Sequence, residues 1–262
     1  MRPLVLALIL VGCAPQATDP PAPFPGGTLI DLTHAFDTQT PYWPTADGFE
    51  MEIDFRGMTD GGYWYEANTI RTAEHGGTHL DAPVHFAEGK HSTEEIPLER
   101  LVAPAVMLDV SEQAAANPDY LVSVADLEAW ENEHGAIPDG HILLVRTGFA
   151  RFWPDRTQYM GTADRGQEAT ADLHFPGLDP EAARWLVANR SIAALGIDTA
   201  SIDYGQSTDF QAHRVLFAEN IPAFENVGDL SALPPVGFSI AALPMKIVDG
   251  SGGPLRIVAI VQ

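Results

Sequence analysis

Residues 74–86 read Glu74-His-Gly-Gly-Thr-His-Leu-Asp-Ala-Pro-Val-His-Phe86, and we expect the rest of the chain to be organised around this stretch. It contains three histidines and an aspartate at positions of the same parity. A helix is disfavoured here because two glycines, a threonine and a proline interrupt the stretch. In an extended chain, alternate side chains share one face. We therefore expect four side chains to converge on one side of a strand or loop: His75, His79, Asp81 and His85.

The side chains on this face have the chemistry of a metal site. Imidazole nitrogens and a carboxylate oxygen suit Zn²⁺ or another first-row ion such as Mn²⁺, and incomplete ligation by protein leaves room for a water molecule. Residues of these types therefore indicate hydrolysis. The alternative is that they are surface or core histidines in a glycine-rich loop, because a single histidine is usually not a ligand.

The composition is that of a soluble globular protein with one large domain or at most two. The chain has 262 residues, of which 45% are hydrophobic, and this is enough to bury a sizeable core. Its formal net charge of -22 disfavours nucleic acid and anionic membrane surfaces as partners, because both require a basic surface. The single cysteine, Cys13, excludes internal disulfides and leaves His, Asp and Glu as the available metal ligands.

The N-terminus has the pattern of an export signal. Arg2 precedes an apolar run, residues 4–11, which is too short to span a bilayer as a helix. Leu10-Val-Gly-Cys13 resembles the lipobox of bacterial lipoprotein precursors. We expect residues 1–13 to be a lipoprotein-type signal peptide, with lipidation of Cys13 and a location at the cell envelope. The alternatives are an ordinary cleaved signal and a buried N-terminal strand.

The domain organisation follows from this N-terminus. Residues 14–27 are polar and rich in proline, as expected of a tether between an anchor and a folded domain. The folded domain is therefore expected over residues 28–262. No internal repeat is visible in it.

Within the domain, predicted strands outnumber predicted helices. Apolar and alternating runs predict strands over residues 28–33, 51–55, 63–72, 102–110, 142–145, 192–197, 221–224, 243–248 and 255–261. Caps and periodicity predict helices over residues 123–134, 180–189 and 210–219. Residues 149–177 lack strong periodicity, and an excursion of that length is typical of a lid or an oligomer contact. The expected class is α/β or α+β with a mixed sheet.

Other candidate site residues lie outside the histidine stretch. Trp43, in a loop braced by prolines, either lines a pocket for a planar substrate or fills the core beneath the loop. Polar residues 198–203 follow a buried strand, as is common at the rim of a site. His213 lies on a predicted helix, and Glu225 follows an apolar run. A buried carboxylate needs a partner, and a metal ion is one candidate.

The stretch from His75 to Phe86 resembles the signature of the bacterial metal-dependent cyclase family, which includes kynurenine formamidases and isatin hydrolases. The resemblance covers the chain from about Thr28 to its end. It continues in further blocks: Trp43-Pro44, Gly196-Ile-Asp-Thr-Ala-Ser-Ile-Asp203, the pair His213 and Glu225, Ala242-Leu-Pro-Met-Lys246, and Gly253-Pro-Leu-Arg256.

This resemblance implies roles for the candidate residues. His85 would be the acid/base, and Trp43 would stack on the substrate ring. The fold would be the swivelling β/β/α type, an α/β domain with a mixed sheet, usually found as a homodimer with the active site near the subunit interface. A divalent Mn or Zn ion would have three direct ligands, His75, His79 and Asp81. His213 and Glu225 would complete a second metal position or form the outer shell of the first.

The leading hypothesis is therefore a metal-dependent hydrolase of a carbon–nitrogen bond in an aromatic amide or lactam, either a cyclic amide such as isatin or an aryl formamide. The alternative substrate is N-formylkynurenine, but residues 201–210 look closer to isatin hydrolases, and a lipoprotein signal does not suit cytosolic tryptophan breakdown. The alternative from another functional class is a cell-envelope lipoprotein that binds a metal or a ligand. A pure binding site would not need a fourth imidazole, His85, that is not a metal ligand. A lyase or a cyclisation reaction on the same fold is a third alternative.

Overall fold

The computed structural model describes residues 26–262. The predicted signal peptide, the lipidation of Cys13 and most of the 14–27 linker lie outside the described residues. They stay predictions, as does the location at the cell envelope. Among residues 26–262, none of the helices combines the length and the apolar character that a membrane span requires.

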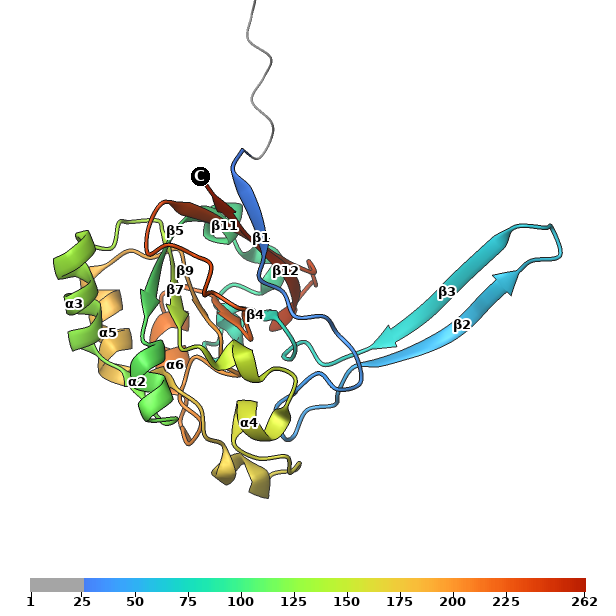
Figure 1. Ribbon diagram of the computed structural model, residues 1–262, viewed down its shortest axis with the longest axis horizontal. Coiled ribbons are helices and arrows are strands. Elements are labelled where there is room, and N and C mark those ends of the chain that lie inside the picture. The colour runs from blue at the N-terminus through green and yellow to red at the C-terminus, as the bar shows by residue number, and fades with distance from the viewer. Residues whose placement is uncertain (1–25) are drawn as a thin grey trace, which may run out of the picture.

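A closed eight-stranded sheet forms the centre of the molecule (Figure 1). Its order is β1-β12-β11-β5-β7-β9-β10-β4, and β4 also pairs with β12, which closes the sheet. The pairings from β5 through β7 and β9 to β10 are parallel, and the remaining pairings are antiparallel, which confirms the α/β class with a mixed sheet. The strands are β1 (Thr28–Asp31), β4 (His79–Asp81), β5 (Val102–Asp109), β7 (Ile142–Arg146), β9 (Ala194–Ile197), β10 (Ala223–Glu225), β11 (Phe238–Pro244) and β12 (Gly252–Val261).

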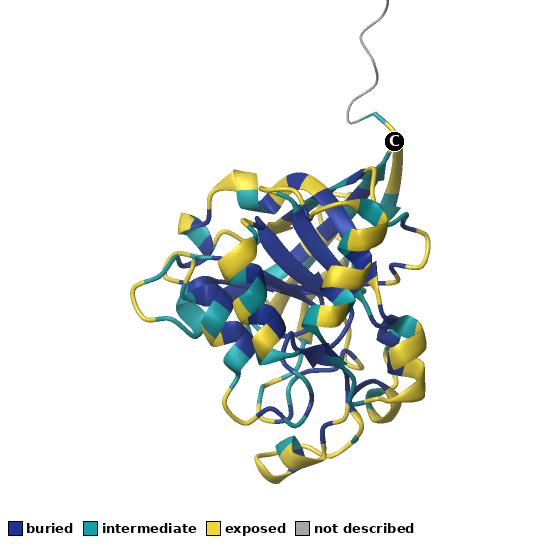
Figure 2. Ribbon diagram, turned by 90° about the vertical axis from the view of Figure 1, so that its left-hand side faces the viewer, coloured by how far each residue is buried: buried dark blue, intermediate teal, exposed yellow. Residues whose placement is uncertain are grey.

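Helices cover one face of the parallel strands. α3 packs on α5, and α5 packs on α6, so the three form one layer. Figure 2 shows their outward faces exposed and the strands beneath them buried. These helices confirm the three that were predicted. The helices are α1 (Leu98–Leu101), α2 (Ser111–Ala116), α3 (Val124–His134), α4 (Arg156–Met160), α5 (Pro180–Asn189) and α6 (Gln211–Phe217), with 3₁₀ turns η1 (Pro83–His85), η2 (Thr93–Glu95), η3 (Phe149–Phe152) and η4 (Glu168–Asp172).

The strands supply two hydrophobic cores because their alternate side chains point to opposite faces. In β7, Ile142 and Leu144 pack inside the closed sheet, whereas Leu143 and Val145 pack under the helices. A strand that is buried on both faces has no polar side, which explains why the sequence shows a continuous apolar run here.

The C-terminal strands differ from the prediction of 243–248 and 255–261. The structure has a longer pair, Phe238–Pro244 with Gly252–Val261, which are antiparallel neighbours. Phe238, Ile240 and Ala242 alternate into the core, so the strand begins earlier than predicted. The chain leaves this ladder after Pro244, and Met245 and Val248 are exposed.

The strands predicted over residues 51–55 and 63–72 form a hairpin that stands away from the body (Figure 1). Within residues 26–262, β2 (Glu50–Met58) and β3 (Trp64–Arg71) pair only with each other, and we call this hairpin the arm. A two-stranded hairpin alone is marginally stable in water. Its apolar side chains are nevertheless exposed: Met51, Ile53, Phe55, Met58, Tyr63, Trp64, Tyr65 and Ile70.

The 149–177 segment contains η3, α4 and η4, each of five residues or fewer. Its buried side chains form a third hydrophobic cluster, which includes Tyr159 and Phe175 and contacts Trp43. The segment therefore packs against a loop of its own chain that carries a predicted site residue. A short two-stranded sheet, β6 (Leu121–Val122) with β8 (Gly177–Leu178), ends it.

Candidate metal site and its aromatic cavity

The histidine stretch is extended over a shorter length than we predicted. Only His79 to Asp81 forms a strand, and their side chains share a face as expected. His75 lies in the preceding loop, and His85 ends the 3₁₀ turn η1. Pro83 at the start of this turn bends the chain, so His85 reaches the site by a turn and not by strand alternation.

The two glycines of the stretch allow the loop to pass close to its neighbours. A Cβ atom on Gly76 would lie 2.1 Å from the ring of Tyr42. Gly77 has a φ of +60°, and a Cβ there would lie 2.3 Å from the ring of Phe36. Any other residue would clash at both positions. The glycines thus fix the path by which His75 returns to the strand that carries His79.

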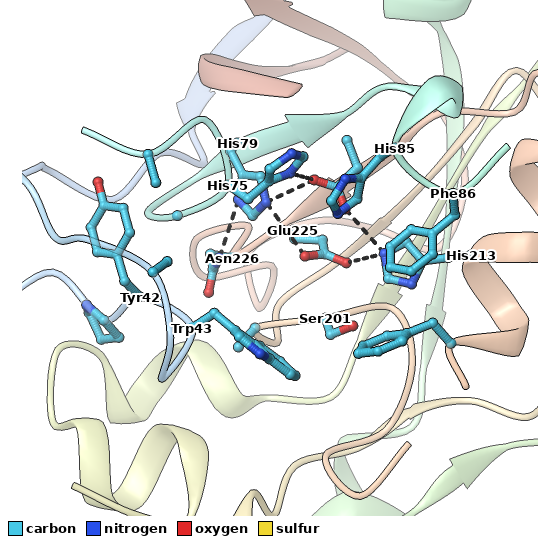
Figure 3. A pocket seen from close by; sticks show the side chains of 17 residues that line it. Tyr42, Trp43, His75, His79, His85, Phe86, Ser201, His213, Glu225 and Asn226 are labelled. Carbon is cyan, nitrogen blue, oxygen red and sulfur yellow. Dashed lines mark hydrogen bonds and ion pairs between the residues drawn. The ribbon is translucent and has the colours of Figure 1, made fainter. Parts of the chain in front are cut away.

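Pairing of β4 with β10 brings a distant carboxylate to the histidines. Glu225 lies directly opposite His79 in this ladder, although 146 positions separate them (225 minus 79). His213 projects from α6 into the same space (Figure 3). Its Nε2 atom lies 3.1 Å from Oδ2 of Asp81 and 3.0 Å from Oε1 of Glu225.

Two groups of three side chains have the geometry of a metal site. One contains His75, His79 and Asp81, and the other contains Asp81, His213 and Glu225. Within each group the candidate ligand atoms all lie within 4.8 Å of one another. Asp81 belongs to both, so its two oxygens join the groups. The structure therefore brings together all five residues that were predicted to hold a metal.

Hydrogen bonds fix which nitrogen of each imidazole faces the site. Nδ1 of His79 donates to the carbonyl of Gly77 at 2.9 Å, and Nδ1 of His213 donates to Asp203 at 2.6 Å. Nε2 of His75 donates to the hydroxyl of Ser251 at 2.8 Å, because that hydroxyl donates its own proton to Glu74. In each ring the other nitrogen faces the site, and it is the one that would coordinate an ion.

The charges of the site favour a cation at its centre. Although burial opposes ionisation, His75 and His79 hold the pKa of Asp81 well below its usual range. Burial and the charge of Asp81 raise the pKa of Glu225. Among residues 26–262, the buried Nε2 of His79 has no hydrogen-bond partner, although it lies 3.0 Å from Oδ1 of Asp81 and 3.6 Å from Oε2 of Glu225. This unpaired nitrogen between two carboxylates fits a divalent ion of the zinc and manganese class.

His85 lies beside this group of donors but outside it. Its ring stacks on His75 with centroids 3.8 Å apart and planes 20° apart, and it lines the cavity next to the site. Burial lowers the pKa of the His85 imidazole to about 4. The ring is therefore neutral at pH 7 and able to accept a proton.

A cavity of about 320 Å³ opens from the carboxylates and histidines. Its volume lies at the lower end of the range for small-molecule sites. Trp43 forms part of its wall (Figure 3). The Trp43 ring centroid lies 6.1 Å from that of Phe210 and 6.4 Å from that of Phe175. Phe86 completes an aromatic wall 5.1 Å from Phe210. The position of Trp43 thus agrees with a pocket residue, although its contact with Phe175 also contributes to core packing.

Several residues that shape the site were not identified from the sequence. Asp203 lies in the polar 198–203 block, which predicted a rim but no contact with His213. Asn226 donates to the carbonyl of Gly77 and accepts a bond from Tyr159, so it holds the histidine loop. Phe210 has a φ of 49°, which is unusual for a bulky residue and is typical of functional sites.

The chain is similar to known proteins over most of its length. A family model described as putative cyclase matches residues 30–204. Isatin hydrolase of Roseibium aggregatum is 32% identical over 90% of this chain and 88% of the relative. Kynurenine formamidase of Salinibacter ruber is 27% identical over 88% of this chain and 96% of the relative. Isatin hydrolase A from Ralstonia solanacearum has a similar structure, with a TM-score of 0.81 and 32% identity, covering 90% of this chain and 92% of that chain.

Proposed function

This chain belongs to the cyclase family, and from that premise we propose that it hydrolyses the carbon–nitrogen bond of a small aromatic amide, with a cyclic amide such as isatin as the preferred substrate. The relative that is 32% identical is an isatin hydrolase, whereas the kynurenine formamidase is 27% identical. This difference supports the cyclic amide over N-formylkynurenine. One observation carries the proposal: five metal-binding side chains converge at the end of a small cavity with aromatic walls.

Amide hydrolysis needs an activated water with a polarised carbonyl group, and it needs a group that transfers a proton. The side chains of the site can hold a metal ion for the first need and provide a histidine for the second. When bound, a divalent ion supplies polarisation of a carbonyl group and a lowered pKa for water. His75, His79, Asp81, His213 and Glu225 would hold that ion, and manganese and zinc both suit their nitrogen and oxygen donors.

His85 would carry the proton between the two halves of the reaction. Its neutral ring would accept a proton from the attacking water as the new carbon–oxygen bond forms. It would then return that proton to the leaving nitrogen as the carbon–nitrogen bond breaks. Trp43 and the other aromatic residues would hold the substrate ring and exclude bulk water from the cavity.

Metal analysis combined with a substrate screen tests the proposal. We expect the purified protein to hydrolyse isatin faster than formanilides or lactones, to lose this activity on chelation, and to regain it with added Mn²⁺ or Zn²⁺. Faster hydrolysis of formanilides would favour the arylformamidase alternative. Full turnover by exhaustively demetallated protein would show that the mechanism does not need a metal.

We further propose that two copies of the chain associate through the arm. Its exposed apolar side chains leave a two-stranded hairpin without a hydrophobic cover, and such a hairpin is marginal in water. Exposed Leu243, Met245 and Val248 offer a second apolar surface on the same chain. In a twofold dimer each copy supplies the cover that the other lacks.

Light scattering is expected to give a mass twice that of one chain. Phe55→Glu on the arm should shift the population towards monomers, because it places a charge in the apolar contact. The matched control is Arg56→Ala, since neighbouring strand residues point to opposite faces. A wild-type protein that is monomeric at every concentration would exclude this dimer.

A further inference from the structure

The 41–46 loop carries Trp43 but has little structure of its own. Its only backbone hydrogen bond within the described loop joins the amide of Ala46 to the carbonyl of Trp43 at 3.0 Å. The loop belongs to no strand or helix. The position of the indole must therefore be set by contacts from elsewhere in the chain.

The 149–177 segment supplies these contacts at every second residue of the loop. Nη1 of Arg156 donates to the carbonyl of Tyr42 at 2.5 Å. The amide of Gly166 donates to the carbonyl of Pro44 at 2.9 Å. Arg165 donates to the carbonyl of Ala46. Three alternate carbonyls of the loop thus face the segment, and all three are bonded to it.

Arg156 is the contact closest to the indole. The carbonyl of Tyr42 belongs to the peptide unit that leads into Trp43, so a bond to this oxygen fixes the start of the tryptophan backbone. The second guanidinium nitrogen, Nη2, donates to the carbonyl of Asp164 at 3.2 Å, which ties α4 to the same point. One planar side chain therefore links the loop to the segment, a geometry that a guanidinium suits better than an ammonium group.

The environment of Arg156 contributes little to the stability of the fold. The side chain is half-buried, and burial lowers the pKa of its guanidinium. Among the described residues, its buried Nε atom has no hydrogen-bond partner. No Asp or Glu forms an ion pair with it in the part of the chain that the structure describes. A half-buried charge that contacts only carbonyl groups gains little net stability.

We propose that Arg156 is a positioning residue for substrate specificity, which holds the peptide unit between Tyr42 and Trp43 and so sets where the indole lies in the cavity. Arg156 does not line the cavity, whereas Trp43 does. The indole in turn sets the space left for the flat face of a substrate ring. This inference rests on the proposed function, because it assigns the segment a part in binding an aromatic amide.

The test is whether replacing Arg156 changes KM while leaving kcat unchanged. Arg156→Ala should raise the KM for isatin about tenfold, the loss of roughly one aromatic contact, while kcat and metal content stay near wild type. Arg156→Lys should be intermediate, because an ammonium can reach one carbonyl. The matched control is Arg151→Ala in the same segment. Arg151 is exposed, and its guanidinium lies 4.5 Å from the ring centroid of Phe152.

A second measurement separates this inference from the proposed function. In the His85→Ala background, calorimetry measures isatin binding without turnover, and adding Arg156→Ala should weaken it about tenfold. Failure of the His85→Ala protein to bind isatin would overturn the proposed substrate and this inference with it.

Binding that is equal with and without Arg156 would overturn this inference alone. The same holds if kcat, metal content and melting temperature fall together, which a purely structural role would produce. If Arg156→Ala does not fold, Arg165→Ala removes the exposed contact to Ala46 of the same loop. Wild-type KM in both Arg165→Ala and Arg156→Lys would then reject the role.

Discussion

A His85→Ala variant is expected to keep a metal content close to wild type and to lose about 10²–10⁴-fold in turnover, the usual range for removal of a general acid or base. The reason is geometric. The ring of His85 stacks on His75 and lines the cavity, but it belongs to neither group of candidate ligands. The measurements are kcat on the best substrate found and metal per chain by elemental analysis.

The control for this prediction is His141→Ala, which removes a histidine at the start of β7 away from the cavity and should retain wild-type turnover. Two results would contradict the role of His85. If His85→Ala loses its metal, the residue is a ligand, and the proton transfer must pass to another group such as Glu225. If it retains both metal and full turnover, His85 is not the acid/base, and the proton transfer belongs to another group.

The sequence predicted the individual elements of the site better than the way in which these elements come together in space. His79 and Asp81 obey strand alternation, and the parity of their positions was enough to place them on one face. His75 and His85 reach the site through a loop with a positive φ at Gly77 and through a 3₁₀ turn after Pro83. Parity carries no information about such paths, so these two agreed with the prediction for a different physical reason.

The contribution of Glu225 depends on long-range pairing. Local patterns predict that a segment is a strand, but register and neighbour are set by contacts between distant segments. β4 has three residues and pairs with both β10 and β12. A three-residue strand offers too little pattern to predict two neighbours, so only the family resemblance joined Glu225 to the histidines before the structure did.

The 149–177 segment was difficult for a related reason. Its helical pieces have four or five residues, which is less than two turns, so no apolar periodicity can develop. The arm presents the opposite case. Its alternating pattern correctly predicted two strands, but alternation indicates one covered face, and within a single described chain that face is exposed.

Replacement of Asp81 by asparagine is expected to abolish metal binding and activity together, since this carboxylate belongs to both groups of ligands. Asparagine keeps the volume but removes the negative charge that His75 and His79 share. A weaker effect is expected for Asp203→Asn. Asp203 bonds to Nδ1 of His213, and loss of such an outer partner typically weakens metal binding 10–100-fold.

Titration calorimetry with Mn²⁺ and Zn²⁺ gives the order of these effects. Asp198→Asn is the matched control, because Asp198 is as buried as Asp203 but bonds to Thr147 and Gly148 away from the ligands. We expect wild-type metal affinity in Asp198→Asn even if its melting temperature falls, since its role is to hold a turn. Wild-type affinity in Asp81→Asn, or a larger loss in Asp203→Asn than in Asp81→Asn, would mean that the ion is not held between the two groups, and the five-residue site would have to be abandoned.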